Sequence, residues 1–415
     1  MKQYGCIGKK LTHSFSREIH ARLADYEYEL IELTEEEIAP FFERKAFAAI
    51  NVTIPYKQTV IPFLDSISPV AQRIGAVNTI VNKDGKLCGY NTDYYGMKAL
   101  MERVGIDLAG KKVLILGTGG TSKTARVLAA DLGAVQVLTV SRRKTTEYIT
   151  YEEAIRDHAD AQVIINTTPS GMYPNCGDKP IDICFFPRLE GVIDAVYNPL
   201  RTNLVLDAQQ RGIPAEGGLY MLVMQAVVAV EFFLDTSIPK ETADRVFASI
   251  YASKENIVLT GMPGSGKSTV GKLLNPDGYE FVDTDEEIEN RCGCTIKDLI
   301  REKGEPYFRD LESEVIREVS SHSCRIISTG GGAVLREENV RYLRRNGKLF
   351  FLNAELSRLR ATDDRPLSDT VDKLKQLYAE RMPIYQTTAD VIVPDMATPQ
   401  EEANHITSKR KDLIL

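Results

Sequence analysis

The sequence predicts an α/β protein with two successive units, each built on a parallel sheet with helices on both faces. Two short β-branched runs, 112–116 and 256–260, each lead into a glycine-rich loop and then a helical pattern. Strand candidates alternate with helices after each loop, as in doubly wound sheets. These candidates are 135–140, 163–166, 191–195, 281–283, 326–329 and 348–352. A helix expected over 240–251 and a short linker near Ser253-Lys254-Glu255 separate the two units.

Composition fits ordinary globular domains and argues against several other classes. The chain has 415 residues, 43% apolar and 26% charged, and its 51 basic against 58 acidic residues leave a net charge of −7. This balance argues against a nucleic-acid or anionic-membrane partner. The most apolar stretch, 221–234, is too short to span a bilayer, and the N-terminus lacks a secretory signal. With only seven cysteines, we expect a cytoplasmic protein; a homo-oligomer remains possible.

Four polar motifs precede the first glycine loop. They are His13-Ser14-Phe15-Ser16, Asn51-Val52-Thr53-Ile54-Pro55-Tyr56-Lys57, Ala76-Val77-Asn78-Thr79 and Gly89-Tyr90-Asn91-Thr92-Asp93. Their hydroxyls and amides would suit a small polyhydroxy acid, and Lys57 beside Asp93 could move a proton in carbonyl/alcohol redox chemistry. For any single motif, a side chain that caps a turn is an equally good interpretation.

The first glycine loop and the residues after the next strand favour a dinucleotide phosphate. Gly117-Thr118-Gly119-Gly120 would let backbone N–H groups approach a pyrophosphate, although Ser122 replaces the usual third glycine. About 20 residues on, where an NAD site has an acidic residue, the chain reads Ser141-Arg142-Arg143-Lys144. Cations there suit a 2′-phosphate, so NADP is the expected cofactor. A tight turn without a ligand is the alternative.

Residues 1 to about 250 resemble shikimate dehydrogenase through these motifs and three further ones. The further motifs are Asn166-Thr167-Thr168-Pro169-Ser170-Gly171-Met172, Asp194-Ala195-Val196-Tyr197-Asn198-Pro199 and 217–226. The resemblance implies a substrate-binding and catalytic domain over 1–100, completed by 235–252, and a Rossmann NADP-binding domain over 101–234. Arg17 stands where the family usually has Pro, and Gly8-Lys9-Lys10-Leu11 departs from the usual Gly-x-Pro-Ile.

The same resemblance implies roles for individual residues. Lys57 and Asp93 would form the catalytic pair. The substrate would be held by Ser14, Ser16, Thr53, Asn78, Asp93 and Gln225. The NADP site would be lined by Gly117, Gly119, Gly120, Ser141, Arg142, Thr168 and Met221.

The second loop, Gly261-Met262-Pro263-Gly264-Ser265-Gly266-Lys267-Ser268, matches the P-loop pattern at every position. In such a loop the backbone amides cradle phosphates, the Lys reaches the β/γ-phosphates and the Ser hydroxyl ligates Mg²⁺. Asp283 and Asp285 are expected at the end of the next strand, on the same side of the residue alternation. One could serve the metal's water shell and the other an acceptor hydroxyl.

Several later residues would suit an anionic acceptor. Arg309 could bind a carboxylate in bidentate fashion, and Ser328-Thr329-Gly330-Gly331-Gly332 would offer backbone amides. Arg365, within a lid-like segment over 362–367, and Arg381 add further cations. For each isolated charge, a surface ion pair is the alternative.

Residues 255 to about 395 resemble shikimate kinase, which implies a P-loop kinase domain with a parallel sheet over 255–415. The departures are a first helix interrupted at Asn275-Pro276-Asp277 and two acidic residues, Asp363 and Asp364, in the lid. The resemblance implies that Lys267 and Arg365 are catalytic and that Ser268 and Asp283 serve Mg²⁺. ATP would be held by Gly264, Gly266, Lys267, Ser268, Thr269 and Arg365. Shikimate would be held by Asp285, Arg309, Gly330, Gly331, Gly332 and Arg381.

Together the resemblances imply a bifunctional enzyme of chorismate and aromatic amino acid biosynthesis. One half would reduce 3-dehydroshikimate to shikimate with NADPH, and the other would phosphorylate shikimate with MgATP to shikimate 3-phosphate. One alternative is an NAD-dependent quinate/shikimate dehydrogenase, against which Arg142 and Arg143 argue. The other is that one half only binds ligand and regulates its neighbour. The intact polar residues of both sites argue against it: Lys57, Asp93, Lys267, Ser268 and Asp285.

Two weaker signals carry no function. Cys292-Gly293-Cys294 lacks a second Cys/His pair at zinc-ribbon spacing and is expected to form a turn beside a helix. The tail after Met396 is polar, helical at best, and has no recognisable motif.

Overall fold

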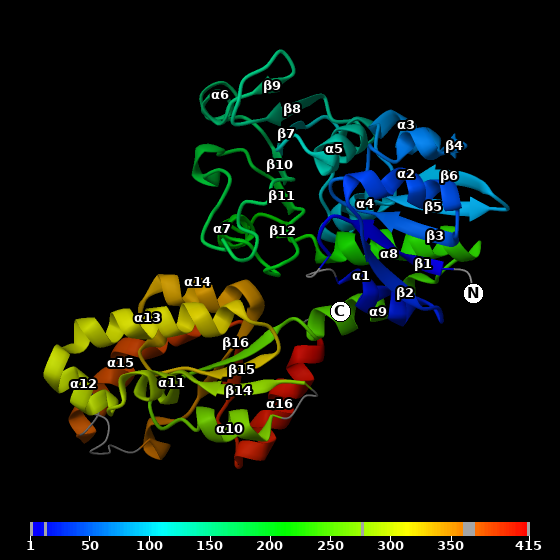
Figure 1. Ribbon diagram of the computed structural model, residues 1–415. Coiled ribbons are helices and arrows are strands. Elements are labelled where there is room, and N and C mark those ends of the chain that lie inside the picture. Colours follow the sequence, from blue (N-terminus) through cyan, green and yellow to red (C-terminus); the bar gives the residue numbers. More distant parts are fainter. Residues whose placement is uncertain (1–2, 12–14, 275–277, 360–369, 413–415) are drawn as a thin grey trace. The chain divides into compact units, whose positions relative to one another are not determined.

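The computed structural model describes residues 3–11, 15–274, 278–359 and 370–412 (Figure 1). The chain divides into two compact units, Met1–Ile250 and Tyr251–Leu415. Two of the site residues expected from the sequence, Ser14 and Arg365, lie outside the described residues.

The first unit begins with a mixed sheet in the order β2-β1-β3-β5-β6-β4. Strands β1, β2 and β3 are parallel, whereas β5 is antiparallel to both β3 and β6. The reversal between β5 and β6 is a two-residue turn at Asp84 and Gly85, whose φ angles are 51° and 87°, as the favoured hairpin turns require. The elements are β1 (Gln3–Gly8), α1 (Ser16–Leu23), β2 (Tyr28–Glu32), α2 (Glu35–Arg44), β3 (Phe47–Val52), η1 (Ile61–Phe63), β4 (Ser66–Ile67), α3 (Pro69–Ile74), β5 (Thr79–Lys83), β6 (Lys86–Tyr90) and α4 (Asp93–Val104).

The second sheet of this unit is parallel throughout, in the order β12-β11-β10-β7-β8-β9. Its central strands read as unbroken apolar runs because helices cover both faces. In β10 all four residues, Val163–Asn166, are buried. This confirms the doubly wound parallel sheet predicted from the sequence. The elements are β7 (Lys112–Leu116), α5 (Gly120–Asp131), β8 (Gln136–Val140), β9 (Tyr148–Ile149), α6 (Tyr151–Asp157), β10 (Val163–Asn166), η2 (Ile183–Phe185), β11 (Gly191–Asp194), α7 (Asn203–Gln210) and β12 (Ala215–Glu216).

Helix α8 (Leu219–Leu234) packs with the first sheet, although the sequence predicts 101–234 as one nucleotide-binding domain. It contacts α4, α1, β3 and β5 (Figure 1). Ala229 and Phe233 enter the same apolar cluster as Cys6 and Tyr28. Gly96 in α4 allows the close approach, because an added Cβ there would lie 2.5 Å from the Met221 carbonyl oxygen. The helix therefore belongs structurally with residues 1–100.

Helix α9 (Lys240–Ala252) contains the boundary between the two units, and its residues up to Ile250 lie beside α8. The Tyr220 hydroxyl donates to Asp244 Oδ1 at 3.2 Å. The rings of Tyr220 and Phe247 meet edge to face, with centroids 5.0 Å apart. These contacts hold α9 near the first sheet.

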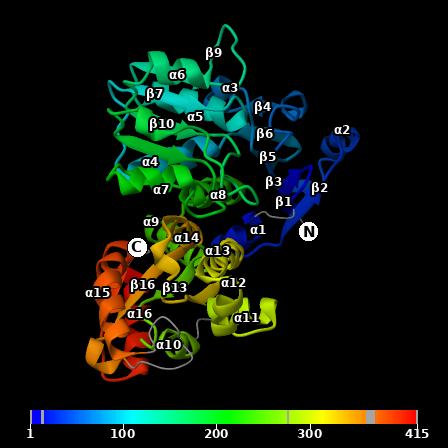
Figure 2. The same ribbon diagram turned by 90° about the vertical axis from the view of Figure 1, so that its left-hand side faces the viewer.

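The second unit contains one parallel sheet in the order β14-β15-β13-β16-β17. Figure 2 shows β13 and β16 of this sheet among the helices of the unit. Alternate strand residues face opposite layers. Val258 and Phe351 pack against α11 to α15, whereas Leu259 and Phe350 pack against α10 and α16. The elements are β13 (Asn256–Thr260), α10 (Lys267–Leu273), β14 (Glu280–Asp283), α11 (Thr284–Cys292), α12 (Ile296–Lys303), α13 (Glu305–Ser321), β15 (Arg325–Ser328), η3 (Ala333–Leu335), α14 (Glu337–Asn346), β16 (Gly347–Asn353), η4 (Leu356–Arg358), α15 (Val371–Thr388), β17 (Val391–Pro394) and α16 (Pro399–Asp412).

The tail after Met396 forms a helix that completes this core. In α16, Ala403 and Ile406 are buried against α10 and the sheet. Arg410 Nη2 donates to the Ala252 carbonyl at 2.6 Å, which fastens α16 to the start of the unit. None of the described helices is long and apolar enough to cross a membrane.

Candidate active sites

Lys57 and Asp93 form the centre of the first site. Lys57 lies in the loop after β3, and Asp93 is the first residue of α4. Lys57 Nζ lies 2.5 Å from Asp93 Oδ2, and the side chains are only 16% and 11% exposed. The other oxygen, Asp93 Oδ1, accepts from Asn78 Nδ2 at 2.9 Å. An ammonium held in this way can exchange a proton with a carbonyl or hydroxyl oxygen.

The remaining residues expected to bind substrate lie at different distances from this pair. Gln225 connects to it through Thr92 and Asn78, because the Thr92 hydroxyl lies 3.3 Å from Gln225 Oε1 and 3.1 Å from Asn78 Nδ2. Thr53 lies in the loop after β3, and no hydrogen bond joins it to Lys57 or Asp93 among the described residues. Ser16 is the first residue of α1.

No role is predicted from the sequence for two residues that the structure places here, nor for Tyr197, which packs beside the motif that holds Ser16. Thr79 and Thr92 are fully buried beside Asn78. Tyr197, within a motif used for the resemblance, packs its ring against Phe15 with centroids 5.2 Å apart. Hydroxyl residues next to an Asn or Asp in a predicted site motif are the signal that could have identified the two threonines.

The first glycine loop lies close to the catalytic pair. Gly117 has a φ of 105°, and an added Cβ would lie 2.9 Å from Thr168 Cγ2, so the loop rests directly on the segment after β10. Gly119 precedes α5, and Gly120 is its first residue. A Cβ on Gly120 would be 3.8 Å from Lys57 Cδ. A nucleotide on this helix N-terminus would therefore lie beside Lys57.

Thr168 is held by a buried hydrogen-bonded chain at the end of the second sheet. Its hydroxyl donates to Asn166 Oδ1 at 2.7 Å, and Asn166 Nδ2 donates to Asp194 Oδ1 at 2.9 Å. Burial raises the pKa of Asp194 to about 7. Met221, also expected at the cofactor, lies buried in the first turn of α8.

The cations expected to bind a 2′-phosphate follow β8, the strand next to β7. Ser141 comes directly after β8, and Gly117 N–H donates to the Val140 carbonyl at 2.9 Å, which joins the two strand ends. Arg142 and Arg143 are exposed and form no ion pair with a described residue, whereas Lys144 pairs with Glu153. Two guanidinium groups are thus available beside the loop.

The P-loop forms one wall of the second site. Gly264 and Gly266 adopt φ angles of 80° and 90°, which favour glycine. Lys267 Nζ donates to the carbonyls of Gly261 and Met262 at 3.0 and 2.9 Å. The Ser268 hydroxyl donates to Asp283 Oδ2 at 2.6 Å. This hydroxyl–carboxylate pair is the type of donor set that Mg²⁺ shares with nucleotide phosphates.

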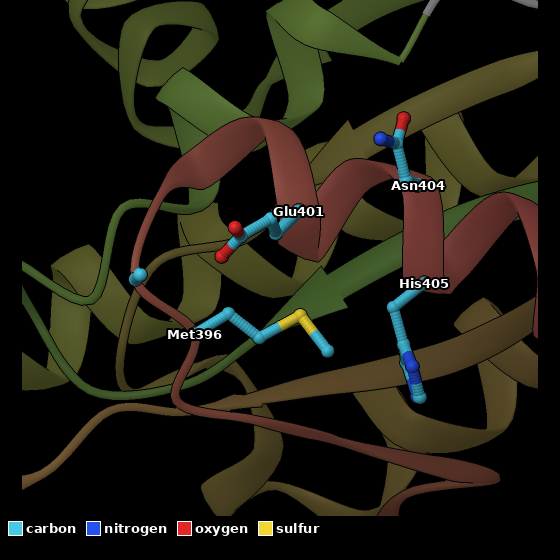
Figure 3. A pocket seen from close by; sticks show the side chains of 5 residues that line it. Met396, Glu401, Asn404 and His405 are labelled. Atoms are coloured by element: carbon cyan, nitrogen blue, oxygen red, sulfur yellow. The ribbon is translucent and has the colours of Figure 1, made fainter.

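A cavity of about 610 Å³ joins the P-loop to the acceptor side. Every described residue expected at this site lines it, and Arg365 lies outside the described residues. The lining includes Gly264, Gly266, Lys267, Ser268, Thr269, Asp283, Asp285, Arg309, Gly330, Gly331, Gly332 and Arg381. A separate hollow on α16, lined by Met396, Ala397, Glu401, Asn404 and His405, contains no expected site residue (Figure 3).

The two aspartates do not share a strand, contrary to the alternation expected from the sequence. Strand β14 ends at Asp283, which caps α11, and Asp285 lies in the first turn of that helix. Asp283 Oδ1 accepts from Asp285 N–H at 3.0 Å, because aspartate is a strong helix cap. Burial, together with the carboxylates of Asp283 and Glu312, raises the pKa of Asp285 to about 7.

Two buried guanidinium groups face the acceptor side. Arg309 Nη1 donates to Glu312 Oε2 at 2.8 Å, and an added Cβ on Gly332 would overlap its guanidinium. Arg381, on α15, is 6% exposed, and burial lowers its pKa. Two close guanidinium groups suit a carboxylate. Glu312, to which the sequence analysis assigns no role, also lines this cavity.

These features define a chain with two catalytic classes: a nucleotide-dependent oxidoreductase and a P-loop phosphotransferase. Residues 6–80 match the family model for the shikimate dehydrogenase substrate binding domain, and residues 263–411 match the one for shikimate kinase. The chain belongs to the shikimate dehydrogenase family and carries a shikimate kinase domain in its second half. This confirms both resemblances drawn from the sequence.

Curated relatives align with the N-terminal part of the chain. Shikimate dehydrogenase (NADP(+)) of Clostridium perfringens strain SM101 is 36% identical over 268 residues, which is 60% of this chain and 98% of that protein. The enzyme of the same name from Clostridium beijerinckii is 35% identical over 265 residues, covering 60% of this chain and 97% of that protein.

Solved structures similar to this chain indicate the same family. Shikimate dehydrogenase 1 from Peptoclostridium difficile is 36% identical with a TM-score of 0.55, covering 60% of this chain and 98% of that one. A chorismate mutase/shikimate 5-dehydrogenase fusion protein from Clostridium acetobutylicum is 33% identical with a TM-score of 0.57, covering 60% of this chain and 97% of that one. The Thermus thermophilus enzyme in complex with NADP(H) and shikimate is 27% identical with a TM-score of 0.54, covering 60% and 99%.

Proposed function

We propose that this chain carries out two consecutive reactions. The first unit reduces 3-dehydroshikimate to shikimate with NADPH, and residues 255–415 phosphorylate shikimate with MgATP to shikimate 3-phosphate. The observation that carries the proposal is that each site combines a nucleotide loop with residues for proton transfer. Lys57, which is paired with Asp93, lies beside Gly120, and Asp285 lies in the P-loop cavity. The hydroxyl made by the first reaction is the one that the second modifies.

In the reduction, Lys57 and Asp93 handle the proton. NADPH, when bound along Gly117–Gly120, supplies a hydride to the substrate carbonyl carbon. Lys57 donates a proton to the carbonyl oxygen as the alcohol forms, and Asp93 holds the ammonium in position. Asn78 and Gln225 orient the substrate's hydroxyl groups, and Ser14, Ser16 and Thr53 complete the set implied by the resemblance.

The preference for NADP rests on Arg142 and Arg143. Neither has an ion-pair partner in the described part of the chain, so both can meet a 2′-phosphate. An oxidative quinate/shikimate dehydrogenase that uses NAD is the second candidate. Comparing NADPH with NADH, and shikimate with quinate, separates the two.

In the phosphorylation, the residues position and stabilise charge, since phosphoryl transfer requires little covalent work from the protein. Arg309 and Arg381 hold the shikimate carboxylate, and Asp285 accepts the proton of the attacking hydroxyl. Ser268 and Asp283 would hold Mg²⁺, which neutralises phosphate charge. Lys267 leaves the loop carbonyls to reach the β- and γ-phosphates. The resemblance implies that Arg365 also serves ATP.

Single substitutions in the full chain test the two assignments. Lys57→Met should abolish reduction of 3-dehydroshikimate while leaving phosphorylation of added shikimate unchanged. Lys267→Ala should do the reverse, so each variant serves as the folding control of the other. Unchanged reduction in Lys57→Met, or unchanged phosphorylation in Lys267→Ala, would overturn the corresponding half and favour a binding module there. We also propose a cytoplasmic location, in line with seven free cysteines.

A further inference from the structure

A network of buried polar side chains lies directly beneath Lys57 and Asp93. Its members come from β2, β3, β5, α8 and the loops before β5 and α4, and each is at most 8% exposed. They are Tyr28, Asn51, Asn78, Thr79, Thr92 and Gln225. Buried polar groups at this density require matched donors and acceptors.

One contact fixes which way the Asn78 amide faces. The backbone N–H of Thr92 donates to Asn78 Oδ1 at 2.7 Å. Because a backbone N–H can only donate, the amide oxygen must lie on this side. Asn78 Nδ2 then points to Asp93 Oδ1, at 2.9 Å. Asp93 Oδ2 is left to Lys57.

Thr79 stabilises this orientation of the Asn78 amide through its hydroxyl. Its hydroxyl accepts from Asn51 Nδ2 at 3.1 Å and donates to Asn78 Oδ1 at 3.1 Å. Asn51 Oδ1 in turn accepts from the Tyr28 hydroxyl at 2.7 Å. The donors therefore run in one direction, from Tyr28 through Asn51 and Thr79 to Asn78.

Thr92 connects the same amide to α8. Its hydroxyl accepts from Asn78 Nδ2 at 3.1 Å, and two acceptors lie within reach of its proton, Asn78 Oδ1 at 3.2 Å and Gln225 Oε1 at 3.3 Å. Gln225 Nε2 then donates to the Leu222 carbonyl at 2.9 Å. One hydroxyl thus orients two amides expected to contact substrate.

We propose that Thr79 and Thr92 are positioning residues for the dehydrogenase reaction. They hold the Asn78 amide so that it donates to Asp93 Oδ1, which keeps Asp93 Oδ2 on Lys57. Neither threonine needs to touch the substrate. The inference deepens the proposed function and rests on Lys57 and Asp93 being the catalytic pair.

Valine is the informative replacement, because it keeps the volume of threonine and removes the hydroxyl. We expect Thr79→Val and Thr92→Val each to lower kcat for 3-dehydroshikimate reduction by about ten-fold or more, because a buried amide loses a partner and the pair loosens. The KM for NADPH should stay within about two-fold, since the glycine loop is untouched. Thr79→Ser and Thr92→Ser, which retain the hydroxyl, should restore most of kcat.

Two controls separate positioning from general damage. Thr139, buried on β8 of the second sheet, lies outside the network, so Thr139→Val should leave kcat unchanged. The kinase activity of each preparation reports on the rest of the chain. Wild-type kcat in both valine variants, or serine variants as impaired as the valine ones, would overturn the inference. A wild-type chain that does not reduce 3-dehydroshikimate would instead overturn the proposed function.

Discussion

Asp285 and Glu312 each direct one carboxylate oxygen at the same glycine. A Cβ added to Gly330 would lie 2.5 Å from Asp285 Oδ1 and 2.9 Å from Glu312 Oε1. Both oxygens are buried and lack a hydrogen-bond partner among the described residues. Two unsatisfied carboxylate oxygens are costly, so this corner of the cavity is prepared for a donor such as a substrate hydroxyl.

Substituting this glycine tests that interpretation. In Gly330→Ala the new methyl group would occupy the space between the two carboxylates, and we expect the KM for shikimate to rise about ten-fold or more. Reduction of 3-dehydroshikimate in the same chain should be unaffected. Gly177, which has open space around its Cα, offers the matched control Gly177→Ala, expected to alter neither activity. A normal KM in Gly330→Ala would contradict the assignment.

The kinase reaction should depend on pH near neutrality. Burial and two neighbouring carboxylates raise the pKa of Asp285 to about 7, so below that pH the free domain holds a proton there and cannot accept another. We expect kcat/KM for shikimate to rise as pH increases through about 7 and then level off. Asp285→Asn should abolish the activity at every pH. A profile that stays flat across roughly one pH unit on either side of 7 would contradict this role.

The stability of the kinase unit should change in the opposite direction. The folded pKa of Asp285 lies above its ordinary value of 3.8, so the folded state binds more protons than the unfolded state between these values. The contribution of Asp285 to the free energy of unfolding must therefore fall as pH rises from about 4 to about 7. Thermal unfolding measured across this pH window should show a smaller decrease in stability for Asp285→Asn than for the wild-type chain.

Cofactor choice should depend on Arg142. Removing an exposed cation that meets the 2′-phosphate should raise the KM for NADPH about ten-fold and leave the KM for NADH nearly unchanged. Steady-state kinetics of Arg142→Ala with both cofactors measure this directly. Lys144→Ala, which removes a cation already paired with Glu153, is the control. An equal rise in both KM values would remove Arg142 from the 2′-phosphate site.

The C-terminal helix should contribute directly to the stability of the kinase unit. Ile406 is fully buried on α16, and Ile406→Ala should lower the free energy of unfolding by about 2–5 kcal/mol. Asn404, exposed on the same helix (Figure 3), provides the control Asn404→Ala, with an expected change below about 0.5 kcal/mol. Denaturant titration measures both. If Ile406→Ala were as stable as the wild-type chain, α16 would add little to the core.

Patterns confined to a few neighbouring residues could be predicted from the sequence. The P-loop and the run at Val163–Asn166 each carry their own signal, because glycine spacing and an unbroken buried run are local properties. The fold class follows from the order of such signals. The positions of Lys57 and Asp93 in one site follow from the family resemblance, since 36 residues separate them along the chain.

Features that depend on tertiary packing could not be predicted. The apolar stretch that forms α8 stands out in the sequence, but its composition does not say which sheet the helix covers. The need for glycine at position 96 becomes clear only from the contact between α4 and α8. In α16, buried Ile406 stands among polar residues, so the apolar face is weak in the sequence. The roles of Thr79 and Thr92 could not be predicted because they depend on hydrogen bonds among four helices and strands and two loops.

The most direct test of the two-reaction assignment is a single time course with 3-dehydroshikimate, NADPH and MgATP. It follows NADPH loss and shikimate 3-phosphate formation in one vessel containing only this chain. We predict that NADPH is consumed and that shikimate 3-phosphate accumulates in equal final amount. Loss of NADPH with accumulation of shikimate, and no phosphate ester, would contradict the assignment of the C-terminal half as its kinase.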